Sequence, residues 1–422
     1  MSRTLLSGNA AVAWGARLAG ADYVPAFPIT PQTEIIETLA GWIAAGELDA
    51  RTVMFESEHS MLTAAGAAAA TGVRVFTATS SQGLLYAMEM LYAVAGWRAP
   101  FVLVNVSRAV AAPITLHSDH GDVLAARDTG FLQLHAATCQ EAVDLVLLAY
   151  RVAEDPRVRL PALVNLDGFL LSFTREPVDL PEAEAARRFV GPFEPGAVSF
   201  RASRPVSQAV AVLGGGPYSY FRYEMHRAAE HAAVVFAEVA AAFAAETGRA
   251  YDAVECYRCD DAEVVFFLIG SLSTTAKDAV DRLREARARV GLVRPRLLRP
   301  FPAEALRRAL AGKSAVAVVD QDLSIGMGGV LHSELAAALY GLAGAPLLAS
   351  FVGGLGGRHV GVDELCAIAD EALAASRAGR SPAPRLLYTE TELREVRKLQ
   401  AIAHGERHEV AQPAKPAGDT DE

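Results

Sequence analysis

The segment Phe27-Pro28-Ile29-Thr30-Pro31-Gln32-Thr33-Glu34 is the first of three polar segments that decide the fold of this chain. The other two are Glu56-Ser57-Glu58-His59-Ser60 and Thr77-Ala78-Thr79-Ser80-Ser81-Gln82-Gly83. Each follows a short apolar run typical of a strand and precedes a run with the apolar period of a helix. Alternating strands and helices predict a parallel sheet. We therefore expect all three segments at the carboxyl ends of parallel strands, where such sheets bind ligands.

The same alternation of strands and helices continues along the chain. Strands are predicted at 22–27, 52–55, 74–78, 101–106, 162–166, 209–213, 264–269, 292–297, 315–319 and 347–351. Helices are predicted at 10–20 with Asn9 as cap, 32–46, 57–72, 140–154 and 218–246. This pattern predicts an α/β protein with two doubly wound, mostly parallel-sheet domains at 1–175 and 209–403. Prolines mark a linker at 176–208, and a polar composition predicts a loose tail at 404–422.

Composition excludes several classes of protein. The chain has 422 residues, of which 52% are hydrophobic, and a net charge of -10 without a basic cluster, so a nucleic-acid footprint is absent. It lacks a run of about 18 apolar residues and a signal-peptide pattern, so we expect a cytoplasmic protein that does not bind membranes. Four cysteines fit a reducing compartment. Cys256 and Cys259 have no second pair or His at ligand spacing, which favours ordinary strand side chains over a metal site.

Two prolines shape the first polar segment. Pro28 and Pro31 fix φ and bias the residues before them away from the helical region, so Ile29 and Thr30 lie in a rigid turn with the Thr30 hydroxyl directed outward. A helix start with proline in its first turn explains the same residues, and from these residues alone it is the favoured interpretation.

The other two segments also allow a purely structural interpretation. Glu56 and Glu58 lie near a helix N-terminus, where the helix dipole favours carboxylates, so capping is the default explanation for both. Ser81 and Gln82 belong to a loop whose hydroxyls and amides could line a pocket or only form a turn.

The segment 109–129 is unusually rich in ionisable residues for a connection after a buried strand. They are His117, Asp119, His120, Asp122, Arg127 and Asp128. Their spacing matches no zinc or calcium signature, so we expect a hydrogen-bonded loop near a site and no metal centre. The glycine-rich loops 326–329 and 353–358 match no nucleotide-binding fingerprint, which favours tight turns and close subunit contact.

The order and spacing of these motifs resemble one family, the 2-oxoacid:ferredoxin oxidoreductases, and within it the alpha subunit of the pyruvate type. The resemblance covers almost the whole chain. Its further motifs are Gly8-Asn9, Ser107-Arg108, Asp119-His120-Gly121-Asp122, Arg127-Asp128-Thr129-Gly130, Gln140-Glu141, Asp167-Gly168-Phe169, Arg299-Pro300-Phe301-Pro302 and Gly353 to Arg358.

The resemblance implies a thiamine-diphosphate-binding pyrimidine-type domain followed by a transketolase C-terminal-like domain. Members of the family oxidatively decarboxylate a 2-oxoacid to an acyl-coenzyme A with thiamine diphosphate and iron–sulfur clusters. A glutamate of the pyrimidine-binding domain hydrogen-bonds N1′ of the cofactor and drives its 4′-amine toward the imino form, which deprotonates C2 of the thiazolium. Glu58 matches this glutamate, and Glu56 is the fallback.

By the same resemblance, Thr30 and Arg108 contact the substrate. The planar two-donor fork of arginine suits the carboxylate of a 2-oxoacid. Contacts to the cofactor are expected from Glu58, Pro28, Ile29, Ser81 and Gln82. The chain departs from the family at Phe173, where many relatives have a histidine, so the role of that histidine is not carried over.

Parts of the expected machinery are missing from this sequence. It contains no Gly-Asp-Gly, the motif that begins the metal and diphosphate anchor of thiamine enzymes, and no cysteine run for a [4Fe–4S] cluster. The resemblance therefore implies partners: a beta subunit with the Gly-Asp-Gly motif and Mg²⁺, a gamma subunit, and a ferredoxin-like delta subunit with the clusters. The small-molecule partners are the 2-oxoacid and coenzyme A.

Three alternatives stay open. The enzyme could belong to the 2-oxoglutarate or aromatic 2-oxoacid branch, phenylglyoxylate included, because one chain does not reveal the substrate. It could be a transketolase-like carbon–carbon ligase that transfers no electrons. It could also be a non-catalytic assembly scaffold of thiamine-enzyme fold, although a scaffold has no need of Thr30, Glu58 and Arg108 together.

Overall fold

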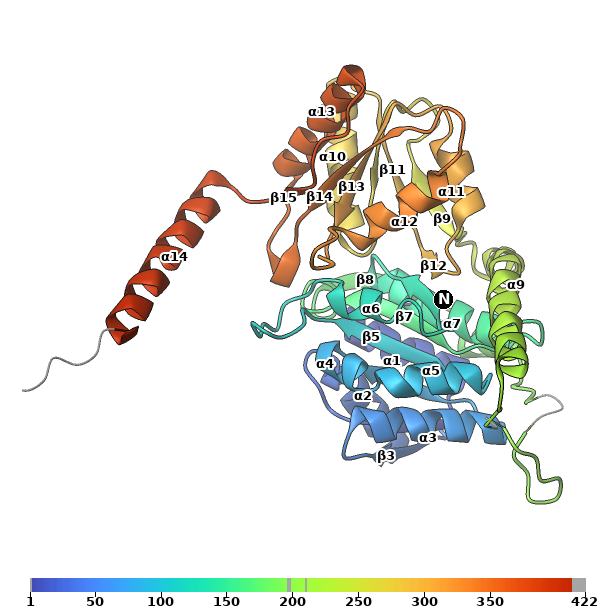
Figure 1. Cartoon of the computed structure of the whole chain (residues 1–422). Helices are drawn as coiled ribbons and strands as arrows, with labels where there is room; N and C mark the ends of the chain where they lie inside the picture. The colour runs from blue at the N-terminus through green and yellow to red at the C-terminus, as the bar shows by residue number, and fades with distance from the viewer. Residues whose placement is uncertain (1, 196–198, 209–210, 412–422) are drawn as a thin grey trace, which may run out of the picture. The chain divides into compact units, whose positions relative to one another are not determined.

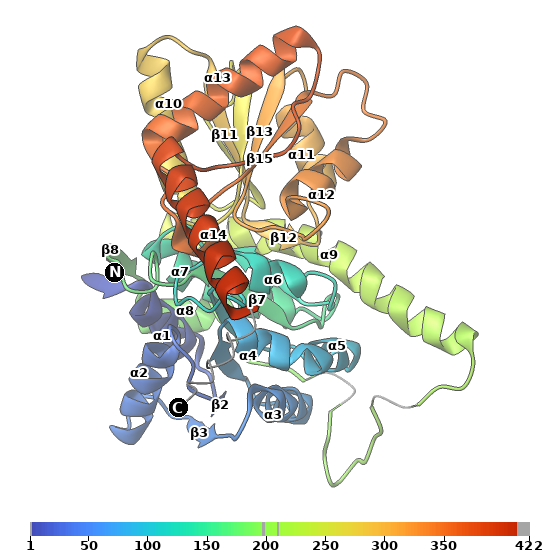
Figure 2. The ribbon, with the colours of Figure 1, turned by 60° about the vertical axis from the view of Figure 1, so that its left-hand side comes forward.

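The computed structural model describes residues 2–195, 199–208 and 211–411. The chain divides into two compact units, Met1–Arg385 and Leu386–Glu422. Most strands of the first unit belong to two larger sheets, one above the other in Figures 1 and 2, and a separate antiparallel pair of strands lies outside them. In the second unit, α14 spans Glu390–Ala411.

The first sheet gathers the strands that precede the polar segments. Its strands are β2 (Tyr23–Ala26), β3 (Arg51–Met54), β4 (Phe76–Thr79), β5 (Val102–Ser107), β6 (Leu132–His135), β7 (Ala162–Asp167) and β12 (Leu297–Arg299). Five of them pair in the order β12-β6-β7-β5-β4, and β2 pairs with β3 in parallel. A parallel bridge from Tyr23 to Val75 connects β2 to the strand segment that leads into β4. The carboxyl ends of β3, β2, β4 and β5 therefore lie along one edge.

Helices cover both faces of this sheet. They are α1 (Gly8–Ala19), α2 (Thr33–Ala44), α3 (Glu58–Thr71), α4 (Ser81–Tyr86), α5 (Met88–Gly96), α6 (Gly121–Ala125), α7 (Cys139–Ala153) and α8 (Ala183–Val190). Along β5, Val102, Val104 and Val106 join the core that contains α1 and α7, whereas Leu103 joins the core that contains α3 and α5. This alternation is the pattern of a doubly wound sheet that is buried on both faces.

The second sheet is also mostly parallel. Its strands are β9 (Val254–Tyr257), β10 (Val264–Phe267), β11 (Val290–Pro295), β13 (Ala315–Asp320) and β14 (Leu347–Val352), in the order β14-β13-β10-β11-β9, and β9 alone of these is antiparallel to its neighbour. Four helices accompany it: α10 (Leu272–Glu285), α11 (Ala303–Leu310), α12 (Val330–Leu339) and α13 (Val362–Ala378). The remaining elements are β1 (Ser2–Ser7), β8 (Arg175–Leu180), α9 (Gly215–Thr247), the 3₁₀ turn Leu355–Gly357 and β15 (Arg385–Leu386). The predicted α/β fold with two mostly parallel sheets is confirmed.

A buried ion-pair network joins the two sheets. Arg294 on β11 is fully buried and donates to both carboxylate oxygens of Glu141 on α7, at 2.6 and 3.0 Å. Arg296 donates to the same carboxylate at 3.1 Å. Burial alone would raise the pKa of Glu141, but the charges of Arg294 and Arg296 and the hydrogen bonds outweigh it and lower the pKa to about 2.

Replacing Glu141 with Gln should therefore destabilise the protein in a pH-dependent way. The folded-state pKa lies below the ordinary value of 4.5, so the contribution of Glu141 is complete above pH 4.5 and is lost as pH falls toward about 2. The shift corresponds to about 3 kcal/mol of unfolding free energy. Denaturant unfolding at several pH values measures the difference in unfolding free energy between wild type and the Gln variant. This difference should shrink toward acid pH. The control is the exposed Glu304, which forms an ion pair with Arg307 on the surface. Its Gln variant should change stability by about 1 kcal/mol or less. Equal losses in the two variants would contradict the prediction.

The structure corrects several predicted elements. The first helix begins at Gly8 and its cap is Ser7, whose hydroxyl accepts from the Ala10 N–H at 3.2 Å; Asn9 is not the cap because its amide binds the Pro31 carbonyl. The predicted strand 209–213 is absent over 211–213, and 209–210 lie outside the described residues.

The segments outside the predicted domains also have regular structure. The expected linker 176–208 contains most of β8, which pairs with β1, and all of α8. The expected loose tail is helical as far as Ala411, because the end of α14 is rich in good helix formers, and 412–422 lie outside the described residues. The domain boundaries at 175, 208 and 403 stay a prediction, since both sheets belong to one compact unit.

One helix, α9, is long and apolar enough to cross a membrane by length and composition. However, its residues Ala232, Val235 and Phe236 are buried in the core that also contains α1 and α7. A single helix of this kind is weak evidence for a membrane span because the core helix of a soluble protein passes the same test.

Candidate active site

The turn after β2 is fixed by contacts from both sides. The Asn9 amide donates to the Pro31 carbonyl at 2.9 Å, and the Gln32 side chain donates back to the Phe27 carbonyl at 2.8 Å. Thr30 is exposed between these contacts. In the same turn, Pro28 is exposed and Ile29 is half-buried. The turn therefore presents Thr30 at the sheet edge on a rigid backbone.

Glu58 lies at the start of α3, directly after the cap residue Ser57. Only 5% of Glu58 is exposed, and burial is the main reason that its pKa is raised, opposed by its own backbone N–H and by the charge of Arg108. A Cβ atom on Gly83 would lie only 2.3 Å from the Glu58 carboxylate. Only glycine thus lets α4 approach the carboxylate so closely. Glu56, in contrast, is fully exposed and accepts a hydrogen bond from the Ser60 hydroxyl.

Arg108 follows β5 and connects the other two segments. Its side chain donates from Nη1 to the Thr30 carbonyl at 2.7 Å and from Nη2 to the Gln82 amide oxygen. The Ser81 hydroxyl donates to the same Gln82 oxygen at 2.7 Å. Among the described residues no carboxylate lies within ion-pair distance of the Arg108 guanidinium. The structure thus brings Thr30, Gln82 and Arg108 together, and Glu58 is near enough to affect the pKa of Arg108.

A buried carboxylate that the sequence analysis did not assign to the site holds this arrangement. Asp122 is fully buried and accepts from the backbone N–H groups of Ser81 at 3.0 Å and Arg108 at 3.2 Å. It also accepts from Asn105 and Ser107, both at 3.0 Å. Asp122 therefore links the segment after β4 to the segment after β5. A polar residue such as Asn105 inside an apolar strand is the sequence signal that could have revealed it.

The site retains polar atoms without partners. Thr79 Oγ1, Ser80 Oγ, Gln82 Nε2 and Arg108 Nε are buried and have no hydrogen-bond partner within the described chain. Burying a polar group without a hydrogen bond costs about 1–3 kcal/mol. A polar ligand that supplies the missing partners would remove this cost. The residues present thus fit a ligand rich in nitrogen and oxygen, as a thiamine cofactor and a 2-oxoacid are.

The motif Asp167-Gly168-Phe169 at the end of β7 packs against the Thr30 turn. A Cβ atom on Gly168 would lie 2.3 Å from the Ser107 carbonyl oxygen and 2.8 Å from the Pro31 ring. Phe169 and Phe173 pack with ring centroids 5.0 Å apart, and His117 lies 5.4 Å from Phe169. Phe173 therefore belongs to an aromatic row beside the site.

Three of the remaining ionisable residues of the segment 109–129 form side-chain hydrogen bonds: Asp119, His120 and Arg127. His120 Nε2 lies 2.7 Å from Asp167, whose other oxygen accepts from the Ser271 N–H at 2.7 Å. Asp119 accepts from the Gly121 N–H at 3.0 Å. Within the part of the chain that the structure describes, no three His, Cys, Asp or Glu residues are grouped to hold a metal ion.

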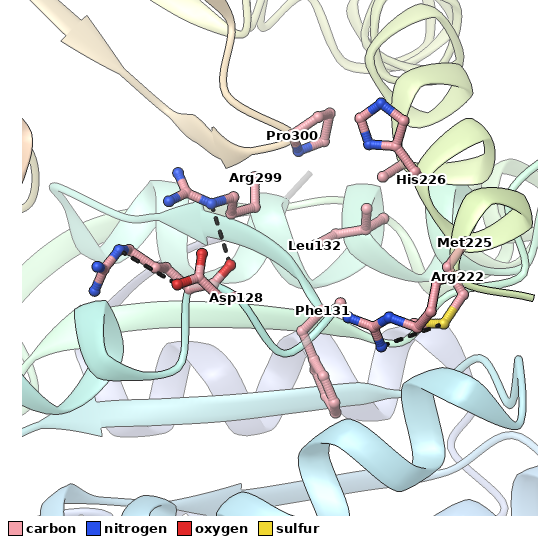
Figure 3. A pocket seen from close by; sticks show the side chains of 11 residues that line it. Asp128, Phe131, Leu132, Arg222, Met225, His226, Arg299 and Pro300 are labelled. Atoms are coloured by element: carbon pink, nitrogen blue, oxygen red, sulfur yellow. Dashed lines mark hydrogen bonds and ion pairs between the residues drawn. The ribbon is translucent and has the colours of Figure 1, made fainter. Parts of the chain in front are cut away.

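A separate pocket of about 190 Å³ lies between α9 and the loop before β6 (Figure 3). Its lining contains three arginines, but Arg127 and Arg299 both pair with Glu334. None of the site residues above line it. The pocket therefore stands apart from the polar edge of the first sheet.

Two family models match this chain. The model described as pyruvate flavodoxin/ferredoxin oxidoreductase, thiamine diphosphate-binding, matches residues 14–241. The model described as pyruvate:ferredoxin oxidoreductase core domain II matches residues 262–365. The first match covers the strands β2 to β7, and the second covers the strands β10 to β14.

Curated relatives match over most of their length. The pyruvate synthase subunit PorA of Pyrococcus abyssi is 43% identical, with 88% of this chain and 94% of the relative covered. PorA of Methanothermobacter thermautotrophicus is 42% identical, with 84% and 91% covered. The ketoisovalerate oxidoreductase subunit VorA of Pyrococcus horikoshii is 40% identical, with 90% and 95% covered.

Solved structures share the fold. A 2-oxoglutarate:ferredoxin oxidoreductase from Magnetococcus marinus, solved with 2-oxoglutarate, coenzyme A and succinyl-CoA bound, matches with a TM-score of 0.70 and 18% identity over 88% of this chain. The chain spans 65% of that structure's chain. A split-gene transketolase, an inactive β4 tetramer, matches with a TM-score of 0.51 and 14% identity over 86% of this chain and 98% of its own.

Proposed function

The chain belongs to the pyruvate flavodoxin/ferredoxin oxidoreductase family, and on this premise we propose that it is the alpha subunit of an enzyme that oxidatively decarboxylates pyruvate or a related 2-oxoacid to acyl-coenzyme A. The observation that carries the proposal is the meeting of Thr30, Glu58 and Arg108 at one edge of the first sheet. A scaffold would have no use for a buried arginine that has no carboxylate partner in the described part of the chain, beside a buried glutamate, since burying both groups costs folding free energy.

The unpartnered polar atoms at this edge support half of a thiamine diphosphate site. When bound, thiamine diphosphate supplies the electron sink that decarboxylation of a 2-oxoacid requires. Glu58 would hold a proton at its carboxylate against the pyrimidine ring. Pro28, Ile29, Ser81 and Gln82 would bind and orient the cofactor.

Arg108 would bind the substrate carboxylate. Two of its N–H groups are engaged by Thr30 and Gln82, which fix the guanidinium plane. Of its five N–H groups, the buried Nε–H, which has no partner among the described residues, and one N–H on each terminal nitrogen remain, and the Nε–H would form a fork with the terminal N–H beside it. Thr30, exposed on its rigid turn, would donate a hydrogen bond from its hydroxyl to the same substrate.

We further propose that partner subunits complete the enzyme. The anchoring Gly-Asp-Gly motif and the cysteines for clusters are missing from this sequence. A beta subunit would bring the diphosphate site with Mg²⁺, a gamma subunit would complete the assembly, and a ferredoxin-like delta subunit would carry [4Fe–4S] clusters. The complex would use coenzyme A and act in the cytoplasm.

The purified chain alone should neither bind thiamine diphosphate tightly nor carry iron, because the diphosphate anchor and the cluster ligands lie outside its sequence. Calorimetric titration and iron analysis measure this directly, and the complex purified with its co-expressed subunits is the control. Stoichiometric iron on the isolated chain would contradict the proposal that partner subunits carry the clusters. Assayed with pyruvate, 2-oxoglutarate and phenylglyoxylate, the complex would identify the substrate branch; turnover of none would reject the proposed function.

A further inference from the structure

The glycine-rich loop 353–358 has no partner in the function described so far. It follows β14 at the carboxyl edge of the second sheet, where the Gly353 N–H donates to the Asp320 carbonyl at 2.9 Å, and two of its glycines also contact the segment 109–120 beside the first sheet. The Gly356 N–H donates to the Asp119 carboxylate at 3.2 Å. Nearby, the His120 N–H donates to the Gln321 carbonyl, just after β13, at 2.7 Å.

Close approach explains the glycines of this loop. A Cβ atom on Gly357 would lie 2.3 Å from the Cβ of His117, and the φ of Gly357 is 82°, in the left-handed region. A side chain there would both strain the backbone and push His117 away. The loop thus lies in direct backbone contact with the segment that follows Arg108.

The segment 109–120 transmits this contact to Arg108. The Ala109 N–H donates to the His117 carbonyl at 3.0 Å. The Ala109 carbonyl lies 3.1 Å from the Ser81 hydroxyl, whose one proton is shared between this oxygen and the Gln82 oxygen. A shift of His117 therefore moves Ala109, the residue bonded to Arg108. It also disturbs the hydroxyl that binds Gln82, the partner of the Arg108 guanidinium.

We infer that the loop 353–358 of the second sheet acts as a clamp that positions Arg108 for the 2-oxoacid carboxylate. Gly357 and Asp119 are its positioning residues, and neither touches the substrate. The inference rests on the proposed function for its effect on turnover but not for the clamp itself. It assigns the second sheet, which holds none of the proposed catalytic residues, a role in binding the substrate.

The test uses the assembled complex with the single variants Gly357→Ala and Asp119→Ala. The control is Gly341→Ala, at a glycine with a φ of 77° and no atom within 4 Å of its added Cβ, so it carries similar strain without a neighbour. Hydrogen exchange of the amides of residues 110–118 should rise about tenfold or more in both test variants and stay unchanged in the control. kcat/KM for the 2-oxoacid should fall by about 10- to 100-fold, while KM for coenzyme A is retained.

The two measurements separate the possible failures. Asp119→Ala adds no bulk, so it reports on the clamp even if Gly357→Ala does not fold. Unchanged exchange in Asp119→Ala would overturn the clamp. Raised exchange with unchanged kcat/KM for the 2-oxoacid would overturn its role in positioning Arg108. A wild-type complex that turns over no 2-oxoacid would reject the proposed function instead, and the exchange comparison would still decide whether the clamp exists.

Discussion

Glu58→Gln should lower 2-oxoacid decarboxylation by about 10²–10⁴-fold, the loss typical of a missing acid–base group, while the complex still assembles. Glutamine keeps the shape of the side chain and can form hydrogen bonds, but it cannot exchange a proton. Glu58 is 5% exposed at the edge where the site residues meet, so its replacement changes the chemistry of the site and little of the surface. Single-turnover decarboxylation with saturating cofactor measures the effect on chemistry apart from cofactor affinity.

Glu56→Gln is the matched control for this prediction. Glu56 precedes the same helix by two residues but is fully exposed, and its contact is with Ser60 on the surface. Its replacement should leave turnover within about twofold of wild type, as surface changes do. If Glu56→Gln is the damaging change and Glu58→Gln is not, the fallback assignment is correct and the proton holder is Glu56.

The pH dependence gives a second readout. Burial raises the pKa of Glu58 above the ordinary value of 4.5. If the ionised form accepts the proton, turnover falls as pH drops through this raised pKa, so the acid limb lies above that of an ordinary glutamate. The Gln variant should lack this limb. An identical limb in both proteins would assign it to another group.

The three polar segments could be placed from sequence because their signals are local. Short apolar runs bounded by turns predict β2, β3 and β4, and the parallel pairing of these strands brings the segments to one edge as expected. The aligned strand ends follow from the right-handed βαβ crossover, which leaves little freedom in how such units stack. The fold and the position of these three segments at one sheet edge could therefore be predicted from the pattern of the sequence, while the roles of the site residues stay a prediction.

The partners within the site could not be predicted in the same way. Sequence distance alone does not decide whether the Arg108 side chain pairs with Asp119, Asp122 or Asp128, or with none of them. In the structure Asp122 accepts from the Arg108 backbone N–H and not from its guanidinium. The guanidinium donates to the carbonyl of Thr30, which is 78 residues away in the chain. Such contacts depend on where side-chain atoms lie to within a few ångströms. Apolar periodicity and turn rules do not determine these positions.

Asn9 shows the same limit for a helix cap. Asparagine is a good cap by intrinsic preference, but Ser7 is equally suitable and lies where the chain turns from β1 into α1. The tertiary contact of Asn9 with the Pro31 carbonyl decides between the two. The glycine-rich loop 353–358 was likewise expected to serve turns and subunit contacts, because nothing local indicates that its neighbour is His117.

Arg108→Ala should lower kcat/KM for the 2-oxoacid roughly 30- to several-thousand-fold. This factor corresponds to a loss of about 2–5 kcal/mol of transition-state stabilisation, as expected for a lost charge-assisted contact in a desolvated site. Arg108→Lys should be less damaging because it keeps the positive charge and loses only the two-donor fork. Cofactor affinity should hardly change. Steady-state kinetics and thermal melts of both variants in the full complex measure the order of damage.

Arg98 provides the matched control that separates substrate binding from structural stabilisation. It is a half-buried arginine whose guanidinium donates to the backbone carbonyls of Val158 and Arg159, and none of its hydrogen bonds within the described chain reaches a site residue. Arg98→Ala should lower the melting temperature and leave kcat/KM near wild type. The guanidinium of Arg108 has no carboxylate partner among the described residues, so stabilising an acidic loop does not explain its burial. An Arg108→Ala enzyme that melts lower but retains its kcat/KM would behave like the Arg98 control and would refute the substrate role.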